Sequence, residues 1–325
     1  MRIASAAYRP EWHTDWATLV AKLDAWVSGA ASQGADLLVF PEYAGVEAAL
    51  IGASDGNGDP MRWRDAMVAS ADRWTDLHRD LAIRHGVTVL AGSLNTAGPD
   101  GPVNRAMICT PQGAVGAQDK MILTPYERHN MGVVPGAGLQ VFYTPLARIG
   151  VLICYDAEFP ELARHLADQG AQILFVPFCT DERQSYMRVR YCCQARAVEN
   201  QIYVVMAGNV GNLPGVSNMD IQYAQSCILT PCDFPFARDG IAADNLNLGN
   251  LRLCTSEKEP TPDTPKPSQA PVIVPKQDLA DKVPRRGATT TAPATRWEEC
   301  MLTGNGRLGA MVFGRPYDET VVINH

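Results

Sequence analysis

One cysteine in this chain stands where a reactive thiol is expected. The apolar run over residues 149–153 ends at Cys154, and an acidic, aromatic turn over 155–161 leads into a helix-like stretch. A strand that ends in a cysteine, with a helix starting just after it, fixes the sulfur and surrounds it with N–H dipoles that favour the thiolate. A lone cysteine in such a run is more often an inert core residue. Two further polar signals favour the reactive interpretation here.

Each of these two signals follows an apolar segment of its own. Residues 37–40 predict a short buried strand that Pro41 ends, so Glu42 lies just beyond its tip. Lys120 lies beside the apolar residues 121–123, where a lysine is rarely placed without a partner. Taken alone, Glu42 is compatible with a solvated loop acid, and Lys120 with a lysine whose stem lies along the surface.

Together, a glutamate, a lysine and a cysteine suit one kind of chemistry. A thiolate attacks an electrophilic carbon, a carboxylate takes the thiol proton and later activates water, and an ammonium stabilises the anion that develops on the substrate. We expect neither a cofactor nor a metal. The six histidines lack metal-ligand spacing, since His78 and His85 are seven residues apart and no cysteine or acid completes a site.

At these residues the chain resembles the nitrilase superfamily of carbon–nitrogen hydrolases. The resemblance covers about residues 1–245, and its three segments occur in the family's order and at its usual spacing: Phe40-Pro41-Glu42, Lys120-Met121-Ile122-Leu123-Thr124-Pro125 followed by Glu127, and Ile153-Cys154-Tyr155-Asp156 with Phe159-Pro160-Glu161. The resemblance implies that Glu42 is the general base, Lys120 the electrostatic stabiliser and Cys154 the nucleophile.

Two more residues take roles from the same resemblance. Glu127 occupies the place of a family glutamate that positions the substrate amide and Lys120, although its neighbours Arg128 and His129 are equally compatible with a solvated loop acid. The N–H of Tyr155 is the expected second oxyanion donor, because the residue after the nucleophile is well placed to supply one.

Other charged residues near the cysteine receive structural roles. We expect Asp156 and Glu158 to cap the helix that begins near Pro160. The default for the arginines on or near the predicted helix after Cys179 is surface ion pairing: these are Arg183, Arg188, Arg190 and Arg196.

The predicted function is that of a thiol hydrolase. It cleaves a non-peptide C–N bond of a small linear amide through a cysteine thioester, releasing ammonia or an amine and a carboxylic acid. True nitrilases usually carry Trp then Glu after the cysteine, whereas Tyr155-Asp156 is common to the amidase-like branches. The alternatives are a nitrile or N-carbamoyl hydrolase of the same superfamily, an inactive or truncated fusion product, and a carbohydrate-active fragment defined by the C-terminal stretch.

Composition argues against some other classes of protein. The formal net charge of −7 argues against a nucleic-acid surface, and no run of about 18 apolar residues suggests a membrane span. Nine cysteines without framework spacing fit a reduced, cytoplasmic setting. The expected partners are therefore a small-molecule amide and, by the family resemblance, a second copy of the chain in a homodimer.

Strand-like and helix-like segments alternate over most of the chain, which predicts an α/β fold. The family resemblance sharpens this expectation to an α-β-β-α sandwich of two mixed sheets with outer helices. The hydrolase domain is predicted over residues 1–254, with one last strand at 245–253.

The composition changes after this predicted domain. Residues 255–295 are rich in Pro, Thr, Lys and Asp, which predicts a disordered linker. Residues 296–325 form a Gly-rich turn followed by an alternating strand. They resemble the start of the N-terminal domain of family 95 glycoside hydrolases, and we interpret them as a truncated fragment without activity of its own.

Overall fold

The computed structural model describes residues 1–52, 59–244, 253–257, 301–304, 309–312 and 321–324. Contacts between residues divide the chain into two units, Met1–Pro260 and Thr261–His325. We describe each unit by itself. Within the described residues, no helix has both the length and the apolar composition needed to cross a membrane.

The first strand, β1 (Arg2–Tyr8), shows how the sequence produces two apolar layers. Its side chains alternate between the two faces. Ile3 and Ala7 belong to one buried cluster, which also contains apolar residues of the strand that precedes Cys154. Ala4 and Tyr8 belong to a second cluster with the N-terminal helices. A strand that is apolar on both faces is therefore buried on both.

The strands of the first unit form one hydrogen-bonded series in the order β5-β4-β3-β2-β1-β9-β8-β7-β6, with β10 and β11 beside β9 and β12 beside β1. Their bounds are β2 (Leu37–Val39), β3 (Thr88–Gly98), β4 (Gly101–Cys109), β5 (Val115–Asp119), β6 (Val141–Tyr143), β7 (Arg148–Val151), β8 (Ile173–Phe178), β9 (Tyr203–Asn209), β10 (Cys227–Leu229), β11 (Ile241–Asp244) and β12 (Leu253–Glu257). β1 joins two halves of this series, because its first residues pair with β2 and its last residues pair with β9.

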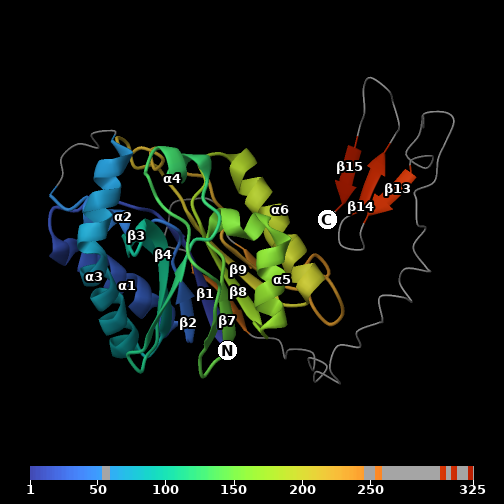
Figure 1. Cartoon of the computed structure of the whole chain (residues 1–325). Helices are drawn as coiled ribbons and strands as arrows, with labels where there is room; N and C mark the ends of the chain where they lie inside the picture. The colour runs from blue at the N-terminus through green and yellow to red at the C-terminus, as the bar shows by residue number, and fades with distance from the viewer. Residues whose placement is uncertain (53–58, 245–252, 258–300, 305–308, 313–320, 325) are drawn as a thin grey trace. The chain divides into compact units, whose positions relative to one another are not determined.

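Helices cover both outer faces, and Figure 1 shows the layers in this unit. α1 (Trp16–Ser32), which begins at the N-cap Asp15, and α3 (Pro60–His85), which ends at Gly86 in the left-handed conformation, lie on one side. α5 (Pro160–Asp168) and α6 (Arg183–Asn200) lie on the other. The expected α-β-β-α sandwich is confirmed.

Strand directions bring the chemistry-bearing residues to one edge. β7, β8, β9, β1, β2 and β3 run parallel, and β5 shares their direction because it is antiparallel to β4, which is antiparallel to β3. The carboxyl ends of β2, β5, β7 and β8 therefore point to the same edge. Glu42, Lys120, Cys154 and Cys179 follow these four strands in that order.

The end of the predicted hydrolase domain is only partly described. Most of the strand expected over 245–253 lies outside the described residues. β12 begins at Leu253 and pairs antiparallel with β1, with Arg2 opposite Glu257. Of the predicted linker over 255–295, only 255–257 lie in the described residues, and they belong to this strand.

The described residues of the second unit form a three-stranded antiparallel sheet in the order β13-β14-β15. These strands are β13 (Met301–Gly304), β14 (Gly309–Val312) and β15 (Val321–Asn324). The alternating strand expected after the Gly-rich turn corresponds to β14.

Candidate active site

Cys154 opens a tight turn and is separated from the end of β7 by two residues. It begins the 3-10 helix η1 (Cys154–Glu158), and its φ of 49° places a non-glycine residue in the left-handed region. Such a conformation costs about 1–3 kcal/mol and is found where the surrounding structure enforces it. The sulfur lies at a cavity of about 180 Å³, so Cys154 is a buried cysteine that also lines a cavity.

A buried cluster of charges lines the same cavity. Lys120 Nζ lies 2.7 Å from Glu42 Oε1 and 2.8 Å from Glu127 Oε2. All three side chains are at most 2% exposed, and all three line the cavity together with Cys154. Neither Lys120 nor Glu127 is the solvated surface group that its local sequence also allowed.

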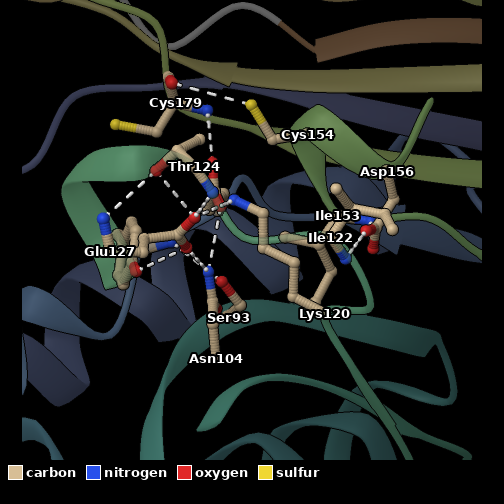
Figure 2. A network of polar contacts seen from close by, with 12 residues as sticks. Ser93, Asn104, Lys120, Ile122, Thr124, Glu127, Ile153, Cys154, Asp156 and Cys179 are labelled. Carbon is tan, nitrogen blue, oxygen red and sulfur yellow. Dashed lines mark hydrogen bonds and ion pairs between the residues drawn. The ribbon is translucent and has the colours of Figure 1, made fainter. Parts of the chain in front are cut away.

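Local sequence explains how Glu127 is held. Helix α4 (Pro125–His129) starts with a capping box, in which Thr124 accepts from the Glu127 N–H and Glu127 Oε2 accepts from the Thr124 N–H at 2.9 Å. The other carboxylate oxygen, Oε1, accepts at 2.9 Å from the Tyr43 hydroxyl and from Asn104 Nδ2. This carboxylate therefore has its hydrogen-bonding capacity engaged on both oxygens (Figure 2).

Three residues that the sequence analysis missed hold Glu42. Asn104 Nδ2 donates to Glu42 Oε1 at 2.9 Å as well as to Glu127, so one amide bridges the two carboxylates. The backbone N–H of Cys179 donates to Glu42 Oε2 at 3.0 Å. Asn209 Nδ2 donates to the backbone oxygen of Glu42 at 2.7 Å. These contacts fix the carboxylate beside the cavity.

Burial and charge shift the pKa values of this cluster in consistent directions. Burial raises the pKa of Glu42 above its ordinary 4.5, against the opposing effect of Lys120. Burial and the Glu42 carboxylate raise the pKa of the Cys154 thiol well above 9.0. Burial alone would lower the pKa of Lys120, but Glu127 and Glu42 outweigh it and hold that pKa well above 10.5.

The pKa of Glu127 shifts in the opposite direction to that of Glu42. Burial would raise its pKa, but Lys120 and the hydrogen bonds it accepts outweigh this effect and lower the pKa below 4.5. With both carboxylates ionised and Lys120 protonated, the cluster carries one negative charge. A thiolate at Cys154 would add a second, so the resting sulfur is the neutral thiol.

Two expectations for the turn after Cys154 are wrong. Asp156 does not cap the helix near Pro160: α5 has no side-chain cap, and Asp156 accepts from the backbone N–H groups of Met121, Ile122 and Ile153 instead. The local sequence resembles a helix cap, but the backbone N–H groups of residues 121 and 122 lie close enough to take the Asp156 carboxylate instead. Glu158 forms an ion pair with Arg188 at 2.7 Å, and both line the cavity.

The arginines of α6 also depart partly from the expected surface ion pairs. Arg196 is buried, and its guanidinium donates to the backbone oxygens of Ala157 and Glu158. Arg190 is buried as well and contacts Cys227 Sγ at 2.8 Å. Both arginines lie on the side of α6 that packs against η1 and the sheet.

Tyr155 lies at the cavity, where its ring packs edge-on against Phe159 with 5.1 Å between centroids. The oxyanion role of its N–H stays a prediction. In the part of the chain that the structure describes, no group of three or more His, Cys, Asp or Glu residues is placed to hold a metal ion.

Known proteins match this chain in both sequence and fold. Residues 2–233 match the carbon–nitrogen hydrolase family, and residues 289–325 match the N-terminal domain of glycosyl hydrolase family 65. The expected likeness of the C-terminal stretch to a glycoside hydrolase N-terminal domain is thus confirmed, under family number 65 and not 95.

Individual relatives agree with the family match. A probable hydrolase of Bacillus subtilis, YhcX, is 43% identical over 223 residues, which cover 69% of this chain but only 43% of that protein. A nitrilase of Pyrococcus abyssi is 31% identical over 60% of this chain and 70% of its own length. The chain thus spans less than half of the first relative.

Among solved structures, the amidase from Nesterenkonia sp. AN1, in a form showing Michael addition of acrylamide at its active-site cysteine, has a TM-score of 0.60 at 24% identity. The likeness covers 80% of this chain and 93% of that one, and at this identity it concerns the fold. From the match over residues 2–233 and the agreement of its fold, the chain belongs to the carbon–nitrogen hydrolase family of the nitrilase superfamily.

Proposed function

We propose that this chain is a thiol hydrolase that cleaves the C–N bond of a small linear amide through a cysteine thioester. The observation that carries the proposal is the buried Glu42–Lys120 ion pair at the same cavity as Cys154. These groups supply the base, the cation and the nucleophile that amide hydrolysis requires.

In the first half-reaction, Glu42 accepts the proton of the Cys154 thiol as Sγ attacks the amide carbon. The raised pKa of both groups suits this transfer, because the thiol is protonated at rest and the carboxylate is a stronger base than an ordinary glutamate. The tetrahedral oxyanion accepts hydrogen bonds from Lys120 and from the N–H of Tyr155. Lys120 has three N–H donors, of which the two carboxylates take two.

Collapse of this intermediate breaks the C–N bond. Protonated Glu42 gives its proton to the departing nitrogen, so ammonia or an amine leaves and the acyl group remains on Cys154 as a thioester. Glu42 then takes a proton from water, which attacks the thioester carbon. The C–S bond breaks, the sulfur recovers its proton from Glu42, and the carboxylic acid leaves. Glu127 positions Lys120, and through Lys120 the substrate amide, in both halves.

The amide is preferred to a nitrile on the Tyr155-Asp156 pair that follows the nucleophile. The relatives include a protein named amidase and one named nitrilase, so both substrate classes stay within the proposal. The remaining alternative, an inactive fusion product, is favoured by the glycosyl hydrolase-like segment at 289–325.

A screen for ammonia release tests these choices. The panel contains short aliphatic amides, ω-amides of dicarboxylic acids, N-carbamoyl amino acids and nitriles, each assayed with the full chain and with Cys154→Ala. Turnover of amides that is absent in Cys154→Ala supports the proposal. Turnover of nitriles or carbamoyl compounds alone supports the alternatives, and no turnover of any member supports the inactive product.

The cellular setting and assembly complete the proposal. A cytoplasmic location rests on the nine cysteines without framework spacing. A homodimer rests on the family resemblance and fits the exposure of Tyr191 and Val198, which lie seven residues apart on α6 and so share a face. Light scattering on the purified chain measures the mass directly, and a strictly monomeric protein would contradict the dimer.

A further inference from the structure

Asp156, two residues after the nucleophile, joins two separate segments of the site. Its Oδ1 accepts from the Met121 N–H at 3.1 Å and from the Ile122 N–H at 2.7 Å, and its Oδ2 accepts from the Ile153 N–H at 3.1 Å. The side chain is fully buried. Met121 and Ile122 directly follow Lys120, and Ile153 directly precedes Cys154. One carboxylate thus spans the segment of the cation and the turn of the nucleophile (Figure 2).

We propose that Asp156 is a positioning residue, which clamps the segment after Lys120 to the turn of Cys154 so that the ammonium and the sulfur keep the spacing that catalysis needs. The inference rests on the proposed function, because it assigns Asp156 a part in the same reaction. Asp156 does not touch the substrate; it acts through the backbone on either side of it.

The chemistry of the contacts explains why a carboxylate stands at this position. Three backbone donors converge on it, and an ionised carboxylate accepts on both oxygens while donating nothing. An asparagine would direct its own N–H₂ group toward at least one of these donors. Burial raises the pKa of Asp156 to about 7, against the opposing effects of Lys120 and the donated N–H bonds. The carboxylate is therefore predominantly ionised above neutral pH.

The clamp also bears on the strained backbone of the nucleophile. Cys154 has a φ of 49°, and Asp156 closes the turn around it from both ends, since its side chain accepts from the Ile153 N–H and its own N–H donates to the Ile153 oxygen. Without the side-chain contact, this backbone is free to relax toward an ordinary conformation. Sγ would then leave its position beside the cavity.

Asp156→Asn tests the clamp, with Asp36→Asn as the matched control. Asp36 Oδ2 accepts from the Arg2 N–H at 2.6 Å and does not line the cavity, so its replacement removes the charge of a carboxylate that holds a backbone N–H outside the site. The kcat and KM are measured with the amide found in the screen, and the rate is divided by the concentration of active sites. We expect Asp156→Asn to lower kcat at least tenfold and to change KM less than threefold. We expect Asp36→Asn to keep kcat within twofold.

A second readout does not depend on a substrate. The rate of Cys154 alkylation by iodoacetamide is measured by peptide mass spectrometry, with the exposed thiol of Cys232 as the internal reference. In the wild-type chain Glu42 takes the Cys154 proton as the sulfur reacts, so Cys154 should be alkylated faster than Cys232 at neutral pH. We expect Asp156→Asn to lower the Cys154 rate at least fivefold while the Cys232 rate and the circular dichroism spectrum stay unchanged.

The outcomes separate the clamp from the proposed function. If the wild-type chain shows neither amide turnover nor selective Cys154 alkylation, the proposed function fails and the clamp fails with it. Suppose instead that the wild type shows both amide turnover and selective Cys154 alkylation. If folded Asp156→Asn then keeps the wild-type kcat and the wild-type rate of Cys154 alkylation, the clamp alone is wrong. Should Asp156→Asn not fold, Asp156→Glu takes its place with the same expected losses; failure of both to fold assigns Asp156 to fold stability and rejects the positioning role.

Discussion

The backbone oxygen of Cys179 lies 3.7 Å from Cys154 Sγ, so the residue that follows β8 contacts the proposed nucleophile. The N–H of the same residue donates to Glu42 Oε2 at 3.0 Å. Figure 2 shows the sulfur of Cys179 turned away from Cys154, so the contact is made by its backbone and not by its thiol. The backbone of Cys179 thus contacts the proposed nucleophile and holds the proposed base beside it.

Cys154→Ala should abolish turnover while the fold is kept. The substitution removes the sulfur and leaves the backbone of the turn, and the chain retains its buried clusters on both faces of the sheets. Ammonia release should fall to the background, with circular dichroism unchanged. Cys232→Ala, at an exposed cysteine, is the control and should keep full activity. Substantial turnover by Cys154→Ala would falsify the mechanism.

Glu42→Gln should damage kcat far more than KM. The carboxamide keeps the shape of the side chain but cannot take the thiol proton or activate water, and loss of a general base costs about 10²–10⁴-fold in rate. Lys120→Met should also suppress kcat, since one oxyanion donor contributes about 3–4 kcal/mol. Because the groups act as one unit, the double variant should be little slower than the slower single variant. Fully multiplicative losses would contradict a shared site.

The pH dependence should report the raised pKa of Glu42. Burial places this pKa above 4.5, and Glu42 acts as a base only when it is ionised. Activity should therefore fall as the pH drops through this raised pKa, with a midpoint above 4.5. The rate of Cys154 alkylation should follow the same acid limb. Glu42→Gln should remove the part of the limb that belongs to Glu42 and leave at most the part near the Asp156 pKa of about 7, where that carboxylate loses its charge. A midpoint below 4.5, or a Glu42→Gln profile identical with that of the wild type, would contradict Glu42 as the base.

A truncation series should locate the end of the folded hydrolase unit. The first unit ends at Pro260, and β12 contributes a backbone ladder with β1. A chain of residues 1–260 should stay soluble and keep its activity and thermal midpoint. A chain of residues 1–250 lacks the ladder, in which each hydrogen bond contributes about 0.5–1.5 kcal/mol, so its midpoint should fall by several degrees. Equal midpoints would show that β12 does not stabilise the unit.

The sequence predicted the parts of the site that carry a local signature. Glu42 and Cys154 each follow a short apolar run, and Lys120 stands out among apolar residues. Residues 124–127 also read as a capping box, Thr-Pro-Tyr-Glu, a signal that would have placed Glu127 at a helix start. The alternation of strand-like and helix-like segments likewise predicted the α/β fold class.

The supporting residues carry no such signature because their partners are distant in the sequence. Asn104 lies within β4 and bridges Glu42 and Glu127, 62 and 23 residues away. Asn209 holds the Glu42 backbone across 167 residues. Strand pairing brings these side chains together, and pairing is not encoded in any local pattern. Asp156 resembled a local cap for the same reason: two of its three donors lie 34 and 35 residues earlier.

Glu158→Gln should shift the substrate preference toward amides that carry a carboxylate. Glu158 Oε1 lies 2.7 Å from Arg188 Nε, and both residues line the cavity, so the glutamate neutralises the arginine there. The Arg188 side chain is 58% exposed, and an exposed pair of this kind contributes about 0–1 kcal/mol. Removal of the glutamate charge should therefore raise kcat/KM for an ω-amide of a dicarboxylic acid by up to about fivefold relative to a neutral amide of equal length.

The matched control for this shift is Glu161→Gln, three residues further along the chain and not part of the cavity lining. It should leave the ratio of the two kcat/KM values unchanged. Raising the ionic strength should shrink the gain in Glu158→Gln, because the new attraction to the substrate carboxylate is screened by salt. A ratio that stays at the wild-type value in Glu158→Gln would mean that the substrate's far end does not reach Arg188.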